Sequence, residues 1–311
     1  MGHRSYKKKV LGSVLTTLVV LSAVNFSSAG QIATYWGQSG NDDAGSEGSL
    51  ADLCNSNNYG IVMIAFLSVF GRGQTPVLNL AGHCDPPSGS CARYASDIAT
   101  CQSQGIKVLL SLGGASAGYG LDSADEAREL AQYIWDNYMG GSNDNSPLGA
   151  AQVDGIDLDI ESGGSSFYSD LGGRLREIAQ NNNYKQVYLA AAPQCPFPDA
   201  SLGPAAGKFL DASLADFVFV QFYNNPDCDF QAGVSGIVSS WTQWTGNIPG
   251  TPEIYLGLPA STAIAGYIDS STLVQSGGVL EQIKGIGNYG GVMLWAPTTD
   301  RTYATNIKGS V

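Results

Sequence analysis

Eight short apolar segments recur along the chain, each bounded by glycine, proline or polar turns. Continuous apolar runs of this length are typical of strands buried on both faces of a parallel sheet. The segments are IATYW (32–36), IVMIAFL (61–67), KVLLSLGG (107–114), VDGIDLDI (153–160), VYLAAAP (187–193), FVFVQFY (217–223), IYLGLP (254–259) and VMLWAP (292–297). Their starts lie about 30 to 45 residues apart, which leaves room for a crossover helix after each strand. The pattern therefore predicts alternating strands and helices, an α/β fold.

Helical patterns lie between several of these strands. In the clearest one, Ser123 and Glu126 form a capping-box signature ahead of the amphipathic run ARELAQYIWDNYM. Eight strand–helix units in about 280 residues predict a single (β/α)8 TIM barrel, although the helix after the eighth strand has a weak pattern. An open doubly wound sheet is the alternative. Because no linker or low-complexity tract divides the chain, we expect one domain.

The fourth segment differs from the others because VDGIDLDIES (153–162) carries four carboxylates, Asp154, Asp157, Asp159 and Glu161. Side chains alternate across a strand, so the last three share one face and the apolar residues between them share the other. In a barrel the acidic face would climb towards the C-terminal ends of the strands, where active sites lie. Three crowded carboxyl groups do not all ionise cheaply, so at least one should have a raised pKa and serve as a general acid. Alternation along the strand places Asp154 on the outward face with the apolar residues, so we expect it to have a structural role.

Two other interpretations of this segment fit less well. A calcium loop starting at Asp157 would need glycine at its sixth position and a bidentate carboxylate at its twelfth, where the chain has Ser162 and Tyr168. An exposed amphipathic strand does not fit beside neighbouring strands that are apolar on both faces and therefore expected to be buried. We therefore favour a catalytic role for the three carboxylates.

The first 29 residues have the features of a secretory signal peptide. A basic start is followed by an apolar run from Val10 to Val24 and by small residues that end at Ala29. The run is too short to predict a membrane span. We expect cleavage after Ala29, a mature domain of residues 30–311, and a destination outside the cell or in an endomembrane-derived compartment such as the vacuole.

The mature domain is strongly acidic. Residues 1–29 contain four of the 15 basic residues and none of the 27 acidic ones, so their removal changes the net charge from −12 to −16. Such a charge argues against nucleic acid or anionic membranes as partners, and we expect a soluble monomer. Six cysteines predict three disulfides in a secreted chain, with 15 pairings open. His83 is the single mature histidine; a loop position is expected for it, and metal sites built from several histidines are excluded.

The sequence DGIDLDIE (154–161) resembles the DxxDxDxE signature of family 18 glycoside hydrolases. Further motifs extend the resemblance over the mature chain: YWGQ (35–38), NLAGHC (79–84), SLGG (111–114), AAPQCPFPD (191–199), QFYNNP (221–226) and GGVMLW (290–295). Together they are similar to plant class III chitinases of the hevamine type. The resemblance implies a (β/α)8 catalytic domain over residues 30–311. It also implies endo-acting, retaining and substrate-assisted hydrolysis of chitin or chitooligosaccharides, with no required cofactor and with a lysozyme side activity to be considered.

The resemblance also implies roles for individual residues. Glu161 would be the general acid and then the base. Asp159 would orient the substrate acetamido group and stabilise an oxazolinium ion, and Asp157 would hydrogen-bond to Asp159. Tyr223 would hydrogen-bond to the acetamido carbonyl. Substrate-binding positions would be Gln221, Trp295, Tyr35, Gln38, Asn79 and Gly113, and disulfides would join Cys54 to Cys101, Cys84 to Cys91 and Cys195 to Cys228.

Two alternative functions stay open at this point. Acidic residues gather at Asp42, Asp43, Asp122, Asp125, Glu126 and Glu129, where they could bind calcium or other divalent cations weakly, as in a storage protein. The acids near Ser123 also suit a helix N-terminus without any cation. A non-hydrolytic chitin lectin or protein inhibitor could share the barrel, but the retained carboxylates and Tyr223 favour an enzyme.

Overall fold

A computed structural model describes residues 1–2, 30–39, 47–115, 118–141, 143, 146–296 and 302–311. Eight parallel strands close into a barrel in the order β1, β2, β4, β5, β6, β7, β8, β9, and β9 pairs again with β1. The barrel strands are β1 Gln31–Trp36, β2 Ile61–Gly71, β4 Lys107–Gly114, β5 Gly155–Ile160, β6 Tyr188–Ala191, β7 Phe217–Gln221, β8 Glu253–Pro259 and β9 Tyr289–Trp295. Closure confirms the predicted (β/α)8 barrel and excludes the open doubly wound sheet.

All eight predicted segments form strands, with small differences at their ends. The sequence did not predict β3 (Gln74–Leu78), which pairs antiparallel with the end of β2 outside the barrel. Its sequence QTPVL contains Pro76, and proline is tolerated only on edge strands, so a strand pattern is hard to detect there.

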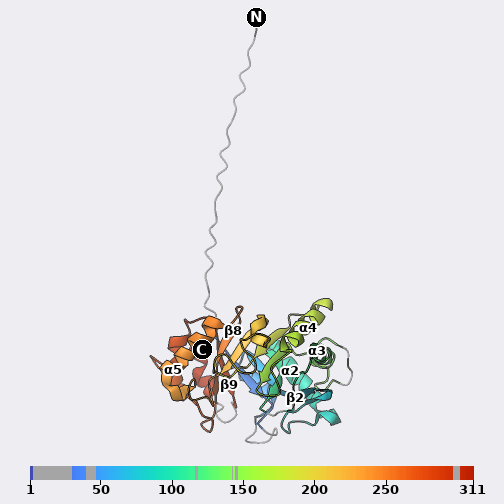
Figure 1. Cartoon of the computed structure of the whole chain (residues 1–311), viewed down its shortest axis with the longest axis horizontal. Coiled ribbons are helices and arrows are strands. Elements are labelled where there is room, and N and C mark those ends of the chain that lie inside the picture. The colour runs from blue at the N-terminus through green and yellow to red at the C-terminus, as the bar shows by residue number, and fades with distance from the viewer. Residues whose placement is uncertain (3–29, 40–46, 116–117, 142, 144–145, 297–301) are drawn as a thin grey trace.

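Helices cover the outside of the barrel. They are α1 Leu50–Asn55, α2 Ala95–Ser103, α3 Ala124–Tyr138, α4 Tyr168–Asn181, α5 Gly233–Asn247, α6 Ser270–Val274, α7 Val279–Ile283 and α8 Tyr303–Ile307. Figure 1 shows α3 and α4 together on one side of the barrel and α5 on the opposite side. Ser123 caps α3 as predicted, accepting from the Glu126 N–H at 3.1 Å, whereas the Glu126 carboxylate accepts from Asp122 N–H at 2.8 Å.

The fifth strand–helix unit, which begins with β6, departs from the prediction. Between β6 and β7, residues 192–216 form a 3-10 turn at Phe209–Ala212 and no α-helix. This segment holds four prolines, and Gly203 and Gly207 have φ of 94° and 81°, outside the helical region. Proline and left-handed glycine both interrupt the α-helical hydrogen-bond pattern, which explains the missing helix.

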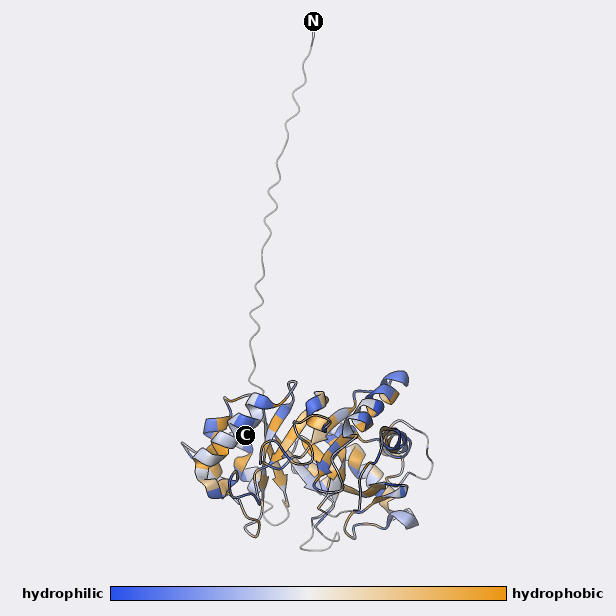
Figure 2. Ribbon diagram, viewed as in Figure 1, coloured by the Kyte–Doolittle hydropathy of each residue, from blue (hydrophilic) through white to orange (hydrophobic). Residues whose placement is uncertain are grey.

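The apolar core has two layers. Between barrel and helices lie the outward residues of the strands and the inner faces of the helices, including the fully buried Trp241 and Trp244 of α5. A second cluster fills the barrel interior and includes Met63, Phe219 and Met293. Figure 2 shows the apolar strands enclosed by helices whose outer turns are polar. The interior is therefore packed, and a ligand has access only at a mouth of the barrel.

Three disulfides join Cys54 to Cys101, Cys84 to Cys91 and Cys195 to Cys228, the pairs that the resemblance implies. Nearly all of the signal segment expected at residues 1–29 lies outside the described part of the chain, as do Asp42 and Asp43. Among the described residues, no helix has the length and apolar character needed to cross a bilayer.

Candidate active site

Strand β5 carries the three carboxylates in the predicted orientation. Ile156, Leu158 and Ile160 pack in the outer core layer, whereas the side chains between them turn inward. Asp157 is 0% and Asp159 6% exposed, whereas Glu161 follows the end of the strand and is solvent accessible. The carboxyl groups thus form a ladder that climbs from the packed barrel interior to its C-terminal mouth.

Asp157, at the base of the ladder, has partners on two other strands. Its Oδ2 accepts from Ser111 Oγ at 2.6 Å and from the Tyr35 hydroxyl at 3.0 Å, whereas its Oδ1 has no hydrogen-bond partner. Ser111 is opposite Asp157 in the β4–β5 register. The expected hydrogen bond from Asp157 to Asp159 is therefore not formed in this structure, because donors from β1 and β4 hold the Asp157 carboxylate instead.

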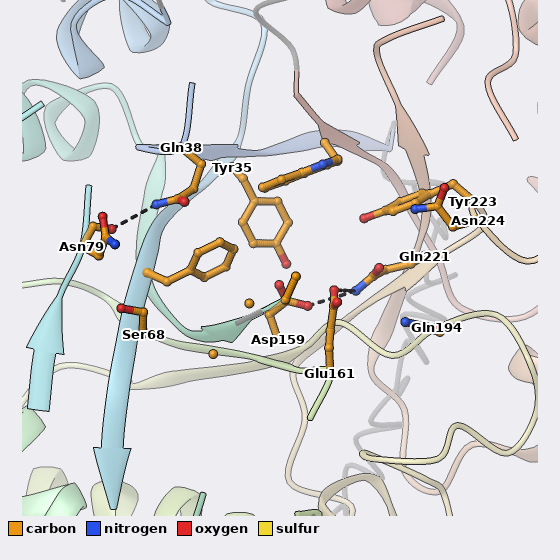
Figure 3. Close-up of a pocket in the computed structure, with 15 residues that line it drawn as sticks. Tyr35, Gln38, Ser68, Asn79, Asp159, Glu161, Gln194, Gln221, Tyr223 and Asn224 are labelled. Atoms are coloured by element: carbon orange, nitrogen blue, oxygen red, sulfur yellow. Dashed lines mark hydrogen bonds between the residues drawn. The ribbon is translucent and has the colours of Figure 1, made fainter. Parts of the chain in front are cut away.

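Gln221, at the end of β7, links the upper two carboxyl groups. Its Nε2 lies 2.9 Å from Asp159 Oδ1, 3.3 Å from Glu161 Oε1 and 2.9 Å from the carbonyl oxygen of Ala192. We expected Gln221 to contact sugar, and it does line the cavity. Its amide nitrogen is nevertheless committed to the carboxylates, which it holds side by side (Figure 3).

Burial and crowding raise the pKa of every member of the ladder. Burial raises the pKa of Asp157 to about 6, although its hydrogen bonds act in the opposite direction. Burial, followed by the charges of Glu161 and Asp157, raises the pKa of Asp159 well above its ordinary range. Burial also raises the pKa of Glu161, and the nearby Asp199 carboxylate adds to this increase. Because ionising both of these neighbouring buried carboxyl groups is unfavourable, the pair retains a proton at pH values where ordinary carboxyl groups are ionised.

A cavity of about 360 Å³ opens above the ladder at the barrel mouth. Nine of the ten catalytic and substrate-binding residues named from the sequence line it, and Asp157 lies beneath. The cavity is lined by Tyr35, Gln38, Phe66, Ser68, Asn79, Gly113, Gly114, Ala115, Asp159, Glu161, Gln194, Gln221, Tyr223, Asn224 and Trp295. Figure 3 shows the hydroxyl end of Tyr223 directed towards the cavity.

Aromatic rings form one wall of the cavity. The Tyr35 ring lies edge-on to Trp295, with centroids 5.5 Å apart, and 6.0 Å from the ring of Phe66. Trp295 ends β9 and is half-buried, so one part of its ring is available to a ligand. Aromatic faces of this kind bind the apolar face of a sugar ring.

Gly113 acts through its lack of a side chain. It lies opposite Asp159 in the β4–β5 register and has φ 112°. A Cβ atom here would lie 2.2 Å from the Asp159 carbonyl oxygen. Glycine therefore allows β4 to pack directly against the part of β5 that carries Asp159.

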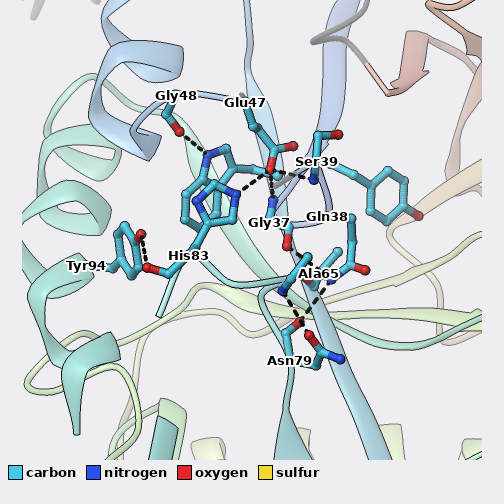
Figure 4. Close-up of polar contacts among 12 residues, drawn as sticks. Gly37, Gln38, Ser39, Glu47, Gly48, Ala65, Asn79, His83 and Tyr94 are labelled. Atoms are coloured by element: carbon cyan, nitrogen blue, oxygen red, sulfur yellow. Dashed lines mark hydrogen bonds and ion pairs between the residues drawn. The ribbon is translucent and has the colours of Figure 1, made fainter. Parts of the chain in front are cut away.

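A buried hydrogen bond between Glu47 and His83 supports the rim of the cavity near Gln38 (Figure 4). Glu47 Oε2 lies 3.0 Å from His83 Nε2 and accepts from the N–H groups of Gly37 and Ser39, which flank Gln38, at 2.6 and 3.3 Å. Gln38 Nε2 in turn donates to the carbonyl oxygens of Ala65 and Asn79 at 2.9 and 3.0 Å. His83 is in a loop as expected, but it is buried against Trp36 and has a structural function.

Sequence reasoning missed several residues of the site. Phe66 belongs to a strand that is apolar on both faces, so nothing in the pattern distinguishes it from core. Gln194 and Asn224 lie within the quoted motifs AAPQCPFPD and QFYNNP but were not singled out. Ser111 begins SLGG and could have been found by its inward parity with Gly113.

The remaining predicted carboxylates lie outside the site. Asp154 Oδ2 accepts from Val108 N–H at 2.8 Å and Oδ1 pairs with Lys185 at 2.5 Å, in agreement with a structural role. Asp122 lies 3.5 Å from Arg72, and Asp125 lies 2.6 Å from Arg128. Within the described ranges, no group of three or more His, Cys, Asp or Glu side chains could hold a metal ion.

A carboxyl pair with raised pKa values beside aromatic rings suits the cleavage of glycosidic bonds, so the fold and the site define the class as a glycoside hydrolase. The family model "Glycosyl hydrolases family 18" matches residues 31–272. The acidic endochitinase SE2 of Beta vulgaris is 50% identical over 299 residues, covering 96% of this chain and 97% of that protein. The chain therefore belongs to glycosyl hydrolase family 18.

Solved structures agree with this assignment. The chitinase ICChI from Ipomoea carnea matches with a TM-score of 0.84 and 42% identity, over 91% of this chain and 100% of that one. The xylanase and alpha-amylase inhibitor protein XAIP-II from Scadoxus multiflorus matches with a TM-score of 0.79 and 36% identity, over 91% of this chain and 99% of that one. The fold is thus shared by proteins described as an enzyme and as an inhibitor, and function depends on the site.

Proposed function

We propose that the protein is an endo-acting chitinase that hydrolyses β-1,4-linked N-acetylglucosamine polymers with retention, by substrate-assisted catalysis. The observation that carries this proposal is the Asp159–Glu161 pair, which Gln221 holds together at the cavity and whose raised pKa values keep a proton available. The endochitinase from Beta vulgaris supports the choice of substrate.

In the first step Glu161, the solvent-accessible member of the pair, gives its proton to the glycosidic oxygen. The bond from the anomeric carbon to that oxygen breaks, and the carbonyl oxygen of the substrate acetamido group bonds to the anomeric carbon, forming an oxazolinium ion. Transfer of the pair's shared proton leaves Asp159 ionised beside this cation, which it stabilises, while Tyr223 donates a hydrogen bond to the acetamido oxygen. Trp295 supports the apolar face of the sugar being cleaved.

In the second step water attacks the anomeric carbon, and the oxazolinium ring opens to restore the acetamido group. Glu161 takes the proton from the water and returns to its initial state. Attack from the face opposite the acetamido oxygen gives net retention. Asp157 keeps its contacts with Ser111 and Tyr35, and its charge raises the pKa of Asp159.

Hydrolysis of a chitin hexasaccharide by wild type and Glu161→Gln tests the proposal. The variant should lose about 10²- to 10⁴-fold in kcat and still bind the sugar, because only proton transfer is removed. The matched control is Glu129→Gln, the same change on the exposed face of α3. NMR of the first products should show the β-anomer. Equal rates of hydrolysis by wild type and Glu161→Gln would refute the proposed mechanism. Hydrolysis of peptidoglycan by the wild type tests whether the protein also has a lysozyme side activity.

We propose that the reaction requires no metal. The acidic residues at the start of α3 are engaged separately: Asp122 and Asp125 with arginines, and Glu126 with the N–H groups of Asp122 and Gly73. Enzyme dialysed against EDTA should retain its activity.

Calcium storage and an inhibitor or lectin function are the alternatives. Calorimetry with millimolar calcium tests calcium storage, and chitin binding without hydrolysis would support an inhibitor or lectin function.

We further propose that residues 1–29 are removed on entry into the secretory pathway and that residues 30–311 act as a monomeric domain outside the cell or in a vacuole-like compartment. Strand β1 starts at Gln31, directly after the proposed cleavage position, which supports this boundary. N-terminal sequencing should give Gly30 as the first residue, and sedimentation should give the mass of one chain.

A further inference from the structure

The position of Glu161 raises the question of what holds the backbone that carries it. Strand β5 ends at Ile160, whose partner in β4 is Gly114, the last residue of that strand. Glu161 is thus the first residue beyond the hydrogen-bond ladder of the barrel. Its side chain must nevertheless be placed accurately, because proton donation requires the carboxyl group within hydrogen-bond reach of the glycosidic oxygen.

The Tyr119 hydroxyl replaces the missing strand neighbour. It accepts from Glu161 N–H at 3.0 Å and from Ser162 N–H at 3.2 Å, and it donates to the carbonyl oxygen of Gly114 at 2.7 Å. A phenolic hydroxyl has one donor and two acceptor positions, so all of its capacity is used. One oxygen atom therefore connects the end of β4 to the two residues that follow β5.

Tyr119 is itself rigidly held. It is fully buried, and its ring stacks on Phe70 with centroids 5.2 Å apart and an interplanar angle of 18°. The loop after Glu161 packs directly on the Tyr119 backbone, where a Cβ on Gly163 would lie 2.0 Å from the Tyr119 carbonyl oxygen. From the outer side, the Arg72 guanidinium donates to the Gly163 carbonyl oxygen.

We infer that Tyr119 is a positioning residue for the general acid: its hydroxyl fixes the backbone of Glu161 so that the carboxyl group reaches the glycosidic oxygen. Arg72 supports the same loop from outside. This inference rests on the proposed function, because it concerns the placement of Glu161 as the general acid. It assigns no contact between Tyr119 and the substrate. Its measurable consequence is a loss of kcat that depends on how much protonation the leaving group needs.

Tyr119→Phe removes the hydroxyl and keeps the stacked ring. With an unsubstituted chitooligosaccharide, kcat should fall about 10- to 100-fold, since a displacement near 1 Å costs about this much, while KM stays within about twofold. With a 4-nitrophenyl glycoside of the same oligosaccharide, whose leaving group departs with little protonation, kcat should fall by no more than about threefold. The difference between the two substrates separates acid positioning from a general loss of folded enzyme.

Tyr168→Phe is the matched control, because the Tyr168 hydroxyl is also buried but has no hydrogen-bond partner in the described part of the chain. Its kcat on both substrates should equal that of wild type. Arg72→Ala is a second test that leaves the core intact, since the Arg72 side chain is 42% exposed. It should lower kcat by about threefold to tenfold on the unsubstituted sugar alone. Its control is Arg128→Ala, which removes another exposed, ion-paired arginine.

The outcomes separate clearly. If wild type is active and the kcat of Tyr119→Phe equals that of wild type, Tyr119 is not a positioning residue and the proposed function stands. The same conclusion follows if Tyr119→Phe loses the same factor in kcat on both substrates together with thermal stability. If Tyr119→Phe does not fold, Arg72→Ala decides by the same comparison of substrates, and equal effects on both overturn the inference. If wild type cleaves neither substrate, the proposed function fails and the inference fails with it.

Discussion

Replacing Asp157 with asparagine should remove a pH-dependent cost of folding. Asp157 is fully buried at the base of the carboxylate ladder, and burial raises its pKa from the ordinary 3.8 to about 6. Asparagine has nearly the same shape and keeps a carbonyl oxygen for the hydrogen bonds from Ser111 and Tyr35. The substitution therefore changes the charge with little change in packing.

The size and sign of the effect follow from linkage between protonation and folding. Between about pH 4 and pH 6 the folded protein binds more protons at Asp157 than the unfolded chain does, so the free energy of unfolding falls as pH rises through this window. The increase in pKa corresponds to a loss of about 3 kcal/mol at pH 7, at about 1.36 kcal/mol per pKa unit. Removing the Asp157 charge also removes one cause of the raised pKa of Asp159, which adds an effect of the same sign.

Urea unfolding of both proteins at pH 4 and pH 7, with disulfides intact, measures this effect. The stability of the variant minus that of wild type should become more positive by about 3 kcal/mol between the two pH values. Any pH-independent cost of the substitution cancels in this comparison. A difference that stays constant with pH, or that becomes more negative, would refute the inference that Asp157 carries a raised pKa in the folded protein.

Two further substitutions test other parts of the site. Asp199→Asn should move the basic limb of the kcat pH profile to lower pH, because removing this carboxylate lowers the pKa of Glu161 and less of the acid is then protonated; an unmoved limb would contradict this. Glu47→Ala should raise KM for chitooligosaccharides about tenfold with a smaller change in kcat, because the backbone on both sides of Gln38 loses its acceptor. A wild-type KM would show that other contacts suffice to hold the rim.

The sequence predicted those features that depend on local periodicity. The apolar runs located all eight barrel strands, and alternation along β5 placed Asp157 and Asp159 inside the barrel and Asp154 outside it. Parity is a property of one strand, so it needs no knowledge of the neighbours. Barrel architecture then placed Glu161 at the mouth.

Features that depend on partners from distant segments could not be predicted in this way. The attachment of Asp157 to Tyr35 and Ser111, instead of Asp159, depends on which strands are adjacent. Tyr119 is an ordinary tyrosine in a loop, and only the folded chain brings its hydroxyl to Glu161. Tertiary contacts of this kind leave no periodic signal in the sequence.

The closure of the barrel also determines when the chain can fold. Ala33 of β1 pairs with Ile61 of β2 on one side and with Met293 of β9 on the other, so the first strand gains its second neighbour only after nearly the whole chain has been synthesised. Until then β1 and β8 expose unpaired edges, which other chains can pair with. Pairing over such a separation makes folding slow and prone to aggregation, so this protein should need protection by chaperones until its last strand is in place.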